Sequence, residues 1–169
     1  MHTLLATSEL HLIINRLAQH LIETDDVLSD VIFIGIQPRG IYVSDKIIEQ
    51  IKKFCPNEKI NYGVLDITFY RDDVRSEIHV ANKTDIPFNI DGKKVILIDD
   101  VLYTGRTIRA ALDALQDFGR PKKVELCVLI NRRFDRELPI QPDHFGKAID
   151  SHSGEKVKVD MELGEVTIS

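Results

Sequence analysis

Residues 95–107, VILIDDVLYTGRT, constrain the fold more than any other part of the chain. The apolar run 95–98 predicts a buried strand, and two adjacent carboxylates, Asp99 and Asp100, follow at its carboxyl end. The turn at 104–105 comes next, and an amphipathic helix begins after it. This order of strand, acidic pair, turn and helix predicts an α/β fold with a ligand site at the end of the strand.

The same segment carries the residue types expected of a sugar phosphate site. The first N–H groups of a helix attract an anion, and Gly105 lets the backbone close around a phosphate. Thr104 and Thr107 can add hydroxyl donors. Asp99 and Asp100 can accept hydrogen bonds from sugar hydroxyls or help to hold a hydrated Mg2+ beside a diphosphate. An acidic pair that merely caps a helix is the alternative, but the combination of features favours a sugar phosphate.

Strand-like and helix-like patterns alternate along the rest of the chain, which predicts an α/β fold over residues 1–169 as a single domain. Apolar and β-rich runs predict strands at 31–36, 62–70, 124–130, 157–161 and 165–168. Amphipathic spacing predicts a first helix capped by Ser8, a second from about Ile41, and a third that ends at Gly119.

Composition is that of an ordinary globular protein, with 43% hydrophobic and 29% charged residues. No apolar run approaches the roughly 20 residues that span a bilayer, and the first residues lack the pattern of a signal peptide. Cys127 lies inside an apolar run, which predicts a buried thiol rather than a disulfide. These features predict a cytoplasmic protein that does not bind membranes.

The loop at 37–40, Gln-Pro-Arg-Gly, is a second candidate for the site because it also follows a predicted strand and precedes a helix. Gly40 permits close backbone approach, and Arg39 can pair with a diphosphate oxygen. A simple turn between strand and helix is the alternative.

Segment 95–107 resembles the ribose-5-phosphate motif of type I phosphoribosyltransferases, which use phosphoribosyl diphosphate (PRPP). Its amino-acid sequence is similar to that of the PyrR family, pyrimidine-operon attenuator proteins that also have uracil phosphoribosyltransferase activity. The resemblance covers most of the chain and includes 35–44, 65–73, 99–121 and 136–147. It implies the type I phosphoribosyltransferase fold, with a central, mainly parallel sheet flanked by helices, a small hood and a flexible loop.

The resemblance also implies roles for individual residues. Asp99, Asp100 and Arg71 are expected to be catalytic. The expected ribose-5-phosphate contacts are Asp99, Asp100, Val101, Leu102, Tyr103, Thr104, Gly105, Arg106 and Thr107. The expected pyrophosphate contacts are Pro38, Arg39, Gly40 and Arg71, with Pro38 standing where the family usually has Thr.

Residues 71–87 are polar and long for a connection, and long loops are often lids. The resemblance implies a flexible loop that closes over PRPP, with Arg71 and Arg75 reaching the diphosphate. A surface excursion with solvated charges is the alternative.

The expected nucleobase is uracil. The purine branch of the family places an acid in the slot that Tyr103 holds here, and Tyr103 cannot play that part at pH 7. Segment 131–140 normally forms the base pocket, and here it carries one extra residue and lacks the family's Gly. The nucleobase contacts expected from it are Arg132, Arg133 and Phe134.

The resemblance therefore implies transfer of the ribose 5-phosphate of PRPP to uracil, giving UMP and pyrophosphate. Mg2+ is the expected cofactor, bound together with PRPP rather than by direct protein ligands. A UMP- or UTP-sensing attenuation regulator with little catalysis, and a phosphoribosyltransferase for another base, both remain open. A homodimer or larger homo-oligomer is expected by analogy.

RNA is a partner that the resemblance leaves open, and the charge balance argues against it. The net charge is −5, with 27 acidic and 22 basic side chains, whereas nucleic-acid binders usually show a basic footprint. In RNA-binding relatives the first helix supplies basic contacts; Arg16 is retained here, but Gln19 and Thr24 replace the usual His and Arg. A local basic patch, or else a solvated surface, is expected from Arg132, Arg133, Arg136 and Lys147.

Overall fold

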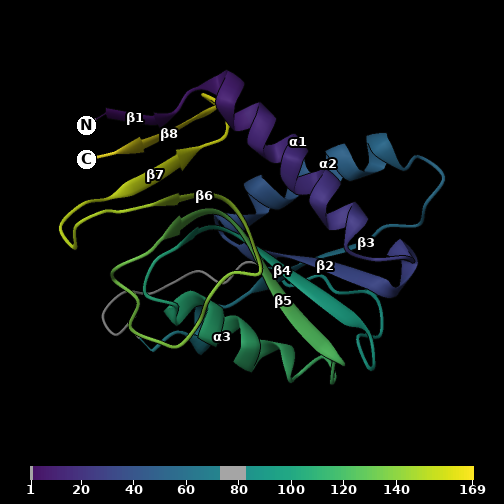
Figure 1. The fold of residues 1–169 in the computed structure, drawn as a ribbon. Coiled ribbons are helices and arrows are strands. Elements are labelled where there is room, and N and C mark those ends of the chain that lie inside the picture. Colours follow the sequence, from purple (N-terminus) through teal and green to yellow (C-terminus); the bar gives the residue numbers. More distant parts are fainter. Residues whose placement is uncertain (1, 73–82) are drawn as a thin grey trace.

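The computed structural model describes residues 2–72 and 83–169, which form two sheets and three α-helices within those ranges (Figure 1). The five-stranded parallel sheet has the order β3-β2-β4-β5-β6, and the antiparallel sheet has the order β1-β8-β7. The strands are β1 (His2–Leu5), β2 (Val31–Gln37), β3 (Asn61–Asp66), β4 (Lys94–Leu102), β5 (Lys123–Arg132), β6 (His144–Ile149), β7 (Val157–Asp160) and β8 (Glu165–Ile168). The α-helices are α1 (Thr7–Glu23), α2 (Gly40–Phe54) and α3 (Arg106–Leu115).

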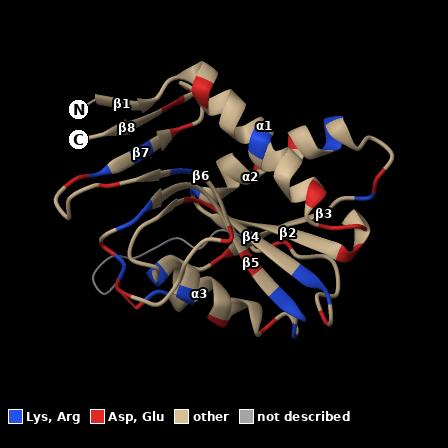
Figure 2. Ribbon diagram, viewed as in Figure 1, with Lys and Arg blue, Asp and Glu red and all other residues tan. Residues whose placement is uncertain are grey.

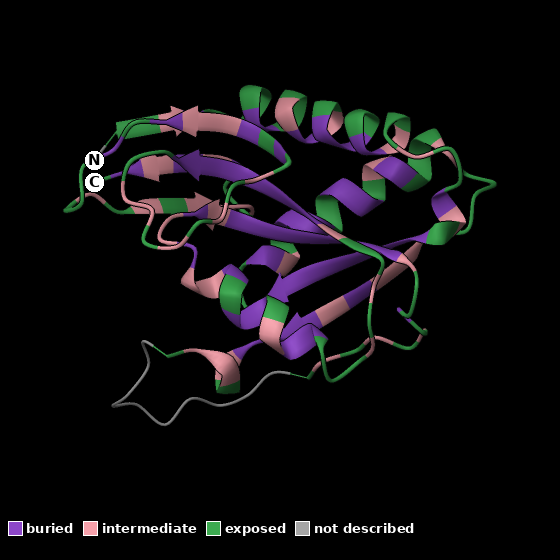
Figure 3. Cartoon of the chain, turned by 60° about the horizontal axis from the view of Figure 1, so that its bottom comes forward, coloured by how far each residue is buried: buried purple, intermediate pink, exposed green. Residues whose placement is uncertain are grey.

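The parallel sheet lies between two helical layers. Helices α1 and α2 cover one face and α3 covers the other (Figure 1), and a separate hydrophobic cluster fills each interface. Because helices cover both faces, the central strands are apolar at nearly every position, and all seven residues of β2 are buried (Figure 3). The α/β prediction and the mainly parallel sheet are confirmed.

The antiparallel sheet, which we call the hood, joins the two ends of the chain. Strand β8 pairs with β1 on one side and with β7 on the other. The hood lies beside the carboxyl ends of the parallel strands, and β7 contacts β4. It therefore forms a wall on the side of the sheet where α/β proteins bind ligands.

Several predicted boundaries are wrong in an informative way. The strand predicted at 95–98 continues as β4 to Leu102, so the acidic pair lies within the strand. The strand predicted at 62–70 ends at Asp66, and a 3-10 turn (Thr68–Tyr70) follows. Helix α3 ends at Leu115 rather than at Gly119 because hydrogen-bonded turns occupy the residues between them.

The cap of the first helix also differs from the prediction. Ala6, not Ser8, is the N-cap residue of α1, and its N–H donates to the Glu9 carboxylate at 3.0 Å. A carboxylate three residues into the helix thus replaces the predicted hydroxyl cap. Strands β1 and β6 are absent from the prediction.

Two other expectations concern the predicted lid and a buried thiol. Residues 73–82, which include Arg75 and most of the expected lid, lie outside the described residues. Cys127 is fully buried and unbonded, as predicted, and burial raises its thiol pKa to about 12. In the described ranges, no helix is both long and apolar enough to cross a membrane.

Candidate active site

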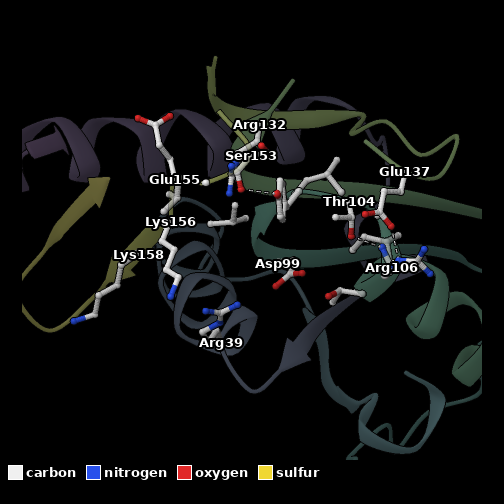
Figure 4. A pocket seen from close by; sticks show the side chains of 18 of the residues that line it. Arg39, Asp99, Thr104, Arg106, Arg132, Glu137, Ser153, Glu155, Lys156 and Lys158 are labelled. Carbon is white, nitrogen blue, oxygen red and sulfur yellow. Dashed lines mark hydrogen bonds and ion pairs between the residues drawn. The ribbon is translucent and has the colours of Figure 1, made fainter. Parts of the chain in front are cut away.

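A cavity of about 800 Å³ opens where the carboxyl end of β4, the start of α3 and the hood meet (Figure 4). Its lining combines segments that are far apart in the sequence: Arg39, Arg71, most of 99–108, Arg132, Glu137 and the hood residues 153–158. Both predicted loops therefore open into one cavity.

The acidic pair is buried at the base of this region. Asp99 and Asp100 are each 5% exposed. Asp99 accepts the N–H of Asp100 at 2.8 Å, and Asp100 accepts the N–H of Val101 at 2.8 Å. Burial, reinforced by the charge of Asp100, raises the pKa of Asp99 well above its usual value. The Nε of Arg39 lies 3.6 Å from a carboxylate oxygen of Asp100.

The loop at 37–40 sits directly against the acidic pair. The peptide bond between Gln37 and Pro38 is cis, and α2 begins at Gly40. A Cβ on Gly40 would lie 2.8 Å from the carbonyl oxygen of Ile98 and 2.9 Å from a carboxylate oxygen of Asp99, so only glycine fits. The Arg39 side chain is 72% exposed, which leaves it accessible to a ligand.

The turn between β4 and α3 has the geometry predicted for an anion site. Gly105 adopts a φ of +95°, and the Thr104 hydroxyl accepts the N–H of Arg106 at 3.3 Å. Across 2–72 and 83–169, the N–H groups of Thr104 and Gly105 donate to no protein acceptor. They are therefore available to a bound anion.

The Arg106 side chain is held away from such an anion. Its Nε donates to Glu137 at 2.6 Å and its Nη1 to Asp72 at 3.0 Å. Arg109 donates to the same Asp72 oxygen at 2.8 Å. Arg71, next to Asp72, lines the cavity as expected.

The three residues expected at the nucleobase are separated by the structure. Arg132 lines the cavity, is 4% exposed and stacks its guanidinium 3.8 Å from the ring centre of Tyr103. Arg133 instead pairs with Asp150 at 2.6 Å, and Phe134 is 71% exposed. Neither Arg133 nor Phe134 belongs to the lining of this cavity.

Sequence reasoning missed the hood side of the cavity. The Tyr103 hydroxyl donates to the carbonyl of Ser153 at 3.3 Å, and Arg132 donates to Ser151 at 2.7 Å and to the carbonyl of His152 at 3.1 Å. Lys156 extends from the hood toward Arg39 (Figure 4). The only signal for this wall was the short strand pattern that begins at residue 157.

The side chains expected in a basic patch are held by separate partners within the protein. Arg136 turns inward and donates to Asn131 at 2.7 Å, and Lys147 donates to the carbonyl of Leu4 at 3.1 Å. Arg16 donates to the carbonyl of Gly146. In Figure 2 the basic and acidic positions are interspersed along the ribbon.

Sequence comparison gives a consistent picture. The family model described as the phosphoribosyl transferase domain matches residues 2–162. The bifunctional protein PyrR of Brevibacillus brevis is 47% identical over 157 residues, covering 92% of this chain and 86% of the relative. That of Enterococcus faecalis is 45% identical over 150 residues, covering 88% of this chain and 83% of the relative.

Structure comparison supports the same fold at much lower identity. The hypoxanthine phosphoribosyltransferase of Trypanosoma cruzi superposes with a TM-score of 0.76 at 16% identity, covering 99% of this chain and 95% of that one. A hypoxanthine-guanine phosphoribosyltransferase of Bacillus anthracis gives a TM-score of 0.71 at 20% identity, covering 90% of this chain and 84% of that one.

Proposed function

Because this chain belongs to the phosphoribosyl transferase domain family, with relatives at about 45% identity that are PyrR proteins, we propose that it is a uracil phosphoribosyltransferase. It transfers the ribose 5-phosphate of PRPP to uracil and releases pyrophosphate. One observation carries this proposal. A buried acidic pair, an anion-binding turn and the Arg39 loop line adjoining parts of one region, opposite a hood wall.

The turn at 104–107 binds the 5-phosphate. The unpaired N–H groups of Thr104 and Gly105 and the start of α3 supply donors and the positive end of the helix dipole. Arg106 contributes through its backbone, because Glu137 and Asp72 occupy its side chain. Val101 and Leu102 complete the strand that carries the motif.

Asp99 and Asp100 bind the ribose hydroxyls. Ribose offers hydroxyl donors, which suit two buried carboxylates with little cationic compensation nearby. In the described ranges, no cluster of three or more His, Cys, Asp or Glu side chains could hold a metal ion by itself. The oxygen donors of the acidic pair suit Mg2+ that arrives with PRPP, and Mg2+ then neutralises charge on the diphosphate.

The pyrophosphate end lies against the other loop. Arg39 and Arg71 supply cations, and the absence of a Cβ at Gly40 lets the loop approach the acidic pair. Pro38 belongs to the same proposed pyrophosphate loop. During transfer, uracil N1 bonds to the anomeric carbon, the bond from that carbon to pyrophosphate breaks, and the N1 proton is released. The protein mainly orients both ends and stabilises the spread positive charge of the sugar.

The nucleobase lies between Tyr103 and the hood. Arg132 fixes the Tyr103 ring by stacking on it, and Ser153 accepts the hydrogen bond of the Tyr103 hydroxyl. A phenol at this position cannot act as the acid of the purine branch, so a pyrimidine fits better.

The second function is regulatory. The similar relatives are called bifunctional, and the resemblance implies control of a pyrimidine operon through RNA. We propose that UMP in the same cavity controls RNA binding. Binding to an operon-leader hairpin should weaken steeply with salt, whereas affinity for a scrambled hairpin should be low throughout.

Other features of the proposal follow from this assignment. PRPP and UMP are metabolites held inside cells, so we propose a cytoplasmic location. Residues 1–169 act as a single phosphoribosyltransferase domain, and the protein works as a homodimer or larger homo-oligomer. Sedimentation at several concentrations measures the oligomer.

The decisive experiment measures pyrophosphate release from PRPP and Mg2+ with uracil, hypoxanthine, guanine or orotate. Uracil-dependent release that Asp100→Asn abolishes is the expected result. Release with a purine alone would overturn the assignment of Tyr103. UMP binding without release from any base would favour the regulator.

A further inference from the structure

Segment 136–138 is bound to the anion-binding turn by three hydrogen bonds that all end on carbonyl oxygens of the turn. The Nη1 of Arg136 donates to the carbonyl of Tyr103. The N–H groups of Glu137 and Leu138 both donate to the carbonyl of Thr104, at 3.0 and 3.2 Å. Two successive peptide carbonyls of the turn are therefore held by one neighbouring segment.

Peptide geometry converts these contacts into a direction for the N–H groups. In a trans peptide the C=O and N–H bonds point in opposite directions. These two peptides are trans, because within 2–72 and 83–169 only the bond between Gln37 and Pro38 is cis. Holding the carbonyls of Tyr103 and Thr104 therefore aims the N–H groups of Thr104 and Gly105 away from segment 136–138. No described residue accepts a hydrogen bond from either of these N–H groups.

Arg136 is itself held by a second contact. Its Nη2 donates to the Asn131 side chain at 2.7 Å, which fixes it to the end of β5. Its Nε is buried and, among the described residues, has no hydrogen-bond partner. The same guanidinium therefore joins the Tyr103 carbonyl to the end of β5.

We propose that Arg136 is a positioning residue that fixes the anion-binding turn, so that the Thr104 and Gly105 N–H groups point at the 5-phosphate before PRPP arrives. The inference rests on the proposed function and deepens it. Pre-orienting these donors removes an ordering step from ligand binding. Because the 5-phosphate does not react, its contacts are the same in the ground and transition states. Their loss should raise KM and leave kcat nearly unchanged.

The test compares Arg136→Gln and Arg136→Lys with the wild type by two readouts. Calorimetry with ribose 5-phosphate measures the anion site without catalysis, and steady-state kinetics separates the KM for PRPP from kcat. Arg136→Gln should weaken ribose 5-phosphate binding and raise KM by about tenfold, with kcat within about threefold. Arg136→Lys should fall between the two, because an ammonium reaches the Tyr103 carbonyl or Asn131 but not both.

Two further variants make the outcome decisive. Arg120→Gln removes an exposed arginine in a loop outside this cavity and should change neither readout. Asn131→Ala frees the far side of Arg136 and should weaken ribose 5-phosphate binding by about threefold. If Arg136→Gln does not fold, Arg136→Lys and Asn131→Ala decide the matter by the same binding measurement.

The failures are distinguishable. A folded Arg136→Gln that binds ribose 5-phosphate as the wild type does would overturn the inference, as would a fall in kcat at constant KM. A wild type that binds ribose 5-phosphate but releases no pyrophosphate with any base would overturn the proposed enzyme alone. A wild type that does not bind ribose 5-phosphate would overturn both.

Discussion

Buried carboxylates lie at both ends of the parallel sheet, but their neighbouring basic groups and the directions of their pKa shifts differ. At the amino ends of the strands, Glu125 is 5% exposed and lies among basic side chains: Lys123 at 2.7 Å, His144 at 2.7 Å and Lys94 at 3.1 Å. Burial alone would raise its pKa, but hydrogen bonds from Lys123, His144 and Lys94 outweigh burial and lower the pKa to about 2.

At the carboxyl ends, Asp99 and Asp100 are equally buried but have little compensation. Arg39 lies at 3.6 Å from Asp100, and the pKa of Asp99 is raised instead of lowered. The cluster around Glu125 is complete within the protein, so we assign it to stability. The acidic pair has less compensation within the protein, in keeping with our proposal that a ligand there supplies donors or cations.

The largest expected effect is at the carboxyl ends of the strands, which we call the functional end because the proposed ligand site lies there. Asp99→Asn should lower uracil-dependent turnover by about a hundredfold or more, because it removes a carboxylate from the proposed ribose site. The free energy of unfolding at pH 7 should not fall, because the ionised form of Asp99 is disfavoured by burial. Turnover assays paired with urea denaturation measure both, and a large loss of stability would place Asp99 with the structural cluster.

The reverse pattern is expected at the other end. Glu125→Gln leaves Lys94 and Lys123 without their shared partner and should lower the free energy of unfolding by about 3 kcal/mol. The KM for PRPP should be unchanged at a temperature where the variant is folded. Asp25, 2.7 Å from Lys94, provides the remaining compensation.

Lowering the pH should change the free energy of unfolding in opposite directions through Glu125 and Asp99. The pKa of Glu125 is depressed, so its stabilising effect is present above about pH 4.5 and is lost as pH falls toward about 2. Asp99 acts in the opposite sense, because a raised pKa favours the folded state at low pH. Unfolding free energy measured from pH 6 to pH 2.5 should fall for the wild type and be flatter for Glu125→Gln. Two further residues adjoin this cluster: Asp25 lies 2.7 Å from Lys94, and the His20 ring lies 5.0 Å from the His144 ring.

The smallest expected effect tests whether the close approach of Gly40 to the acidic pair matters for binding of PRPP. Gly40→Ala places a Cβ against Ile98 and Asp99 and should raise the KM for PRPP by about tenfold. Gly92→Ala is the control, because a Cβ there meets nothing within 4 Å and only its φ of +66° is unfavourable. The control should lose stability without a change in KM, and equal KM values in both variants would refute the role of Gly40.

The comparison also shows what sequence alone can predict. The functional end lies largely within 99–107, where strand, acidic pair and turn are contiguous, so local patterns are sufficient. The Glu125 cluster joins residues from 94, 123, 125 and 144, and only the parallel register brings them together. Charged residues at the start of a strand are usually solvent-exposed, so the sequence does not predict this buried cluster.

Long-range pairing explains the other gaps. Strand β1 exists because it pairs with β8, more than 160 positions away, and no local pattern specifies that partner. The residues predicted at the nucleobase are neighbours in sequence, and sequence order alone does not tell which of them faces the cavity. Tertiary contacts turned Arg132 into the cavity and paired Arg133 with Asp150 outside it.

The pairing of β1 with β8 has a consequence for how the protein is made. A growing chain can complete β2 to β5, and with them the anion-binding turn, before residues 157–168 have been synthesised. The hood can form only after β8 has been synthesised and can pair with β1 and β7. During synthesis, the part of the cavity that we assign to the sugar phosphate is therefore built first, and the wall beside the proposed base site is added at a late stage.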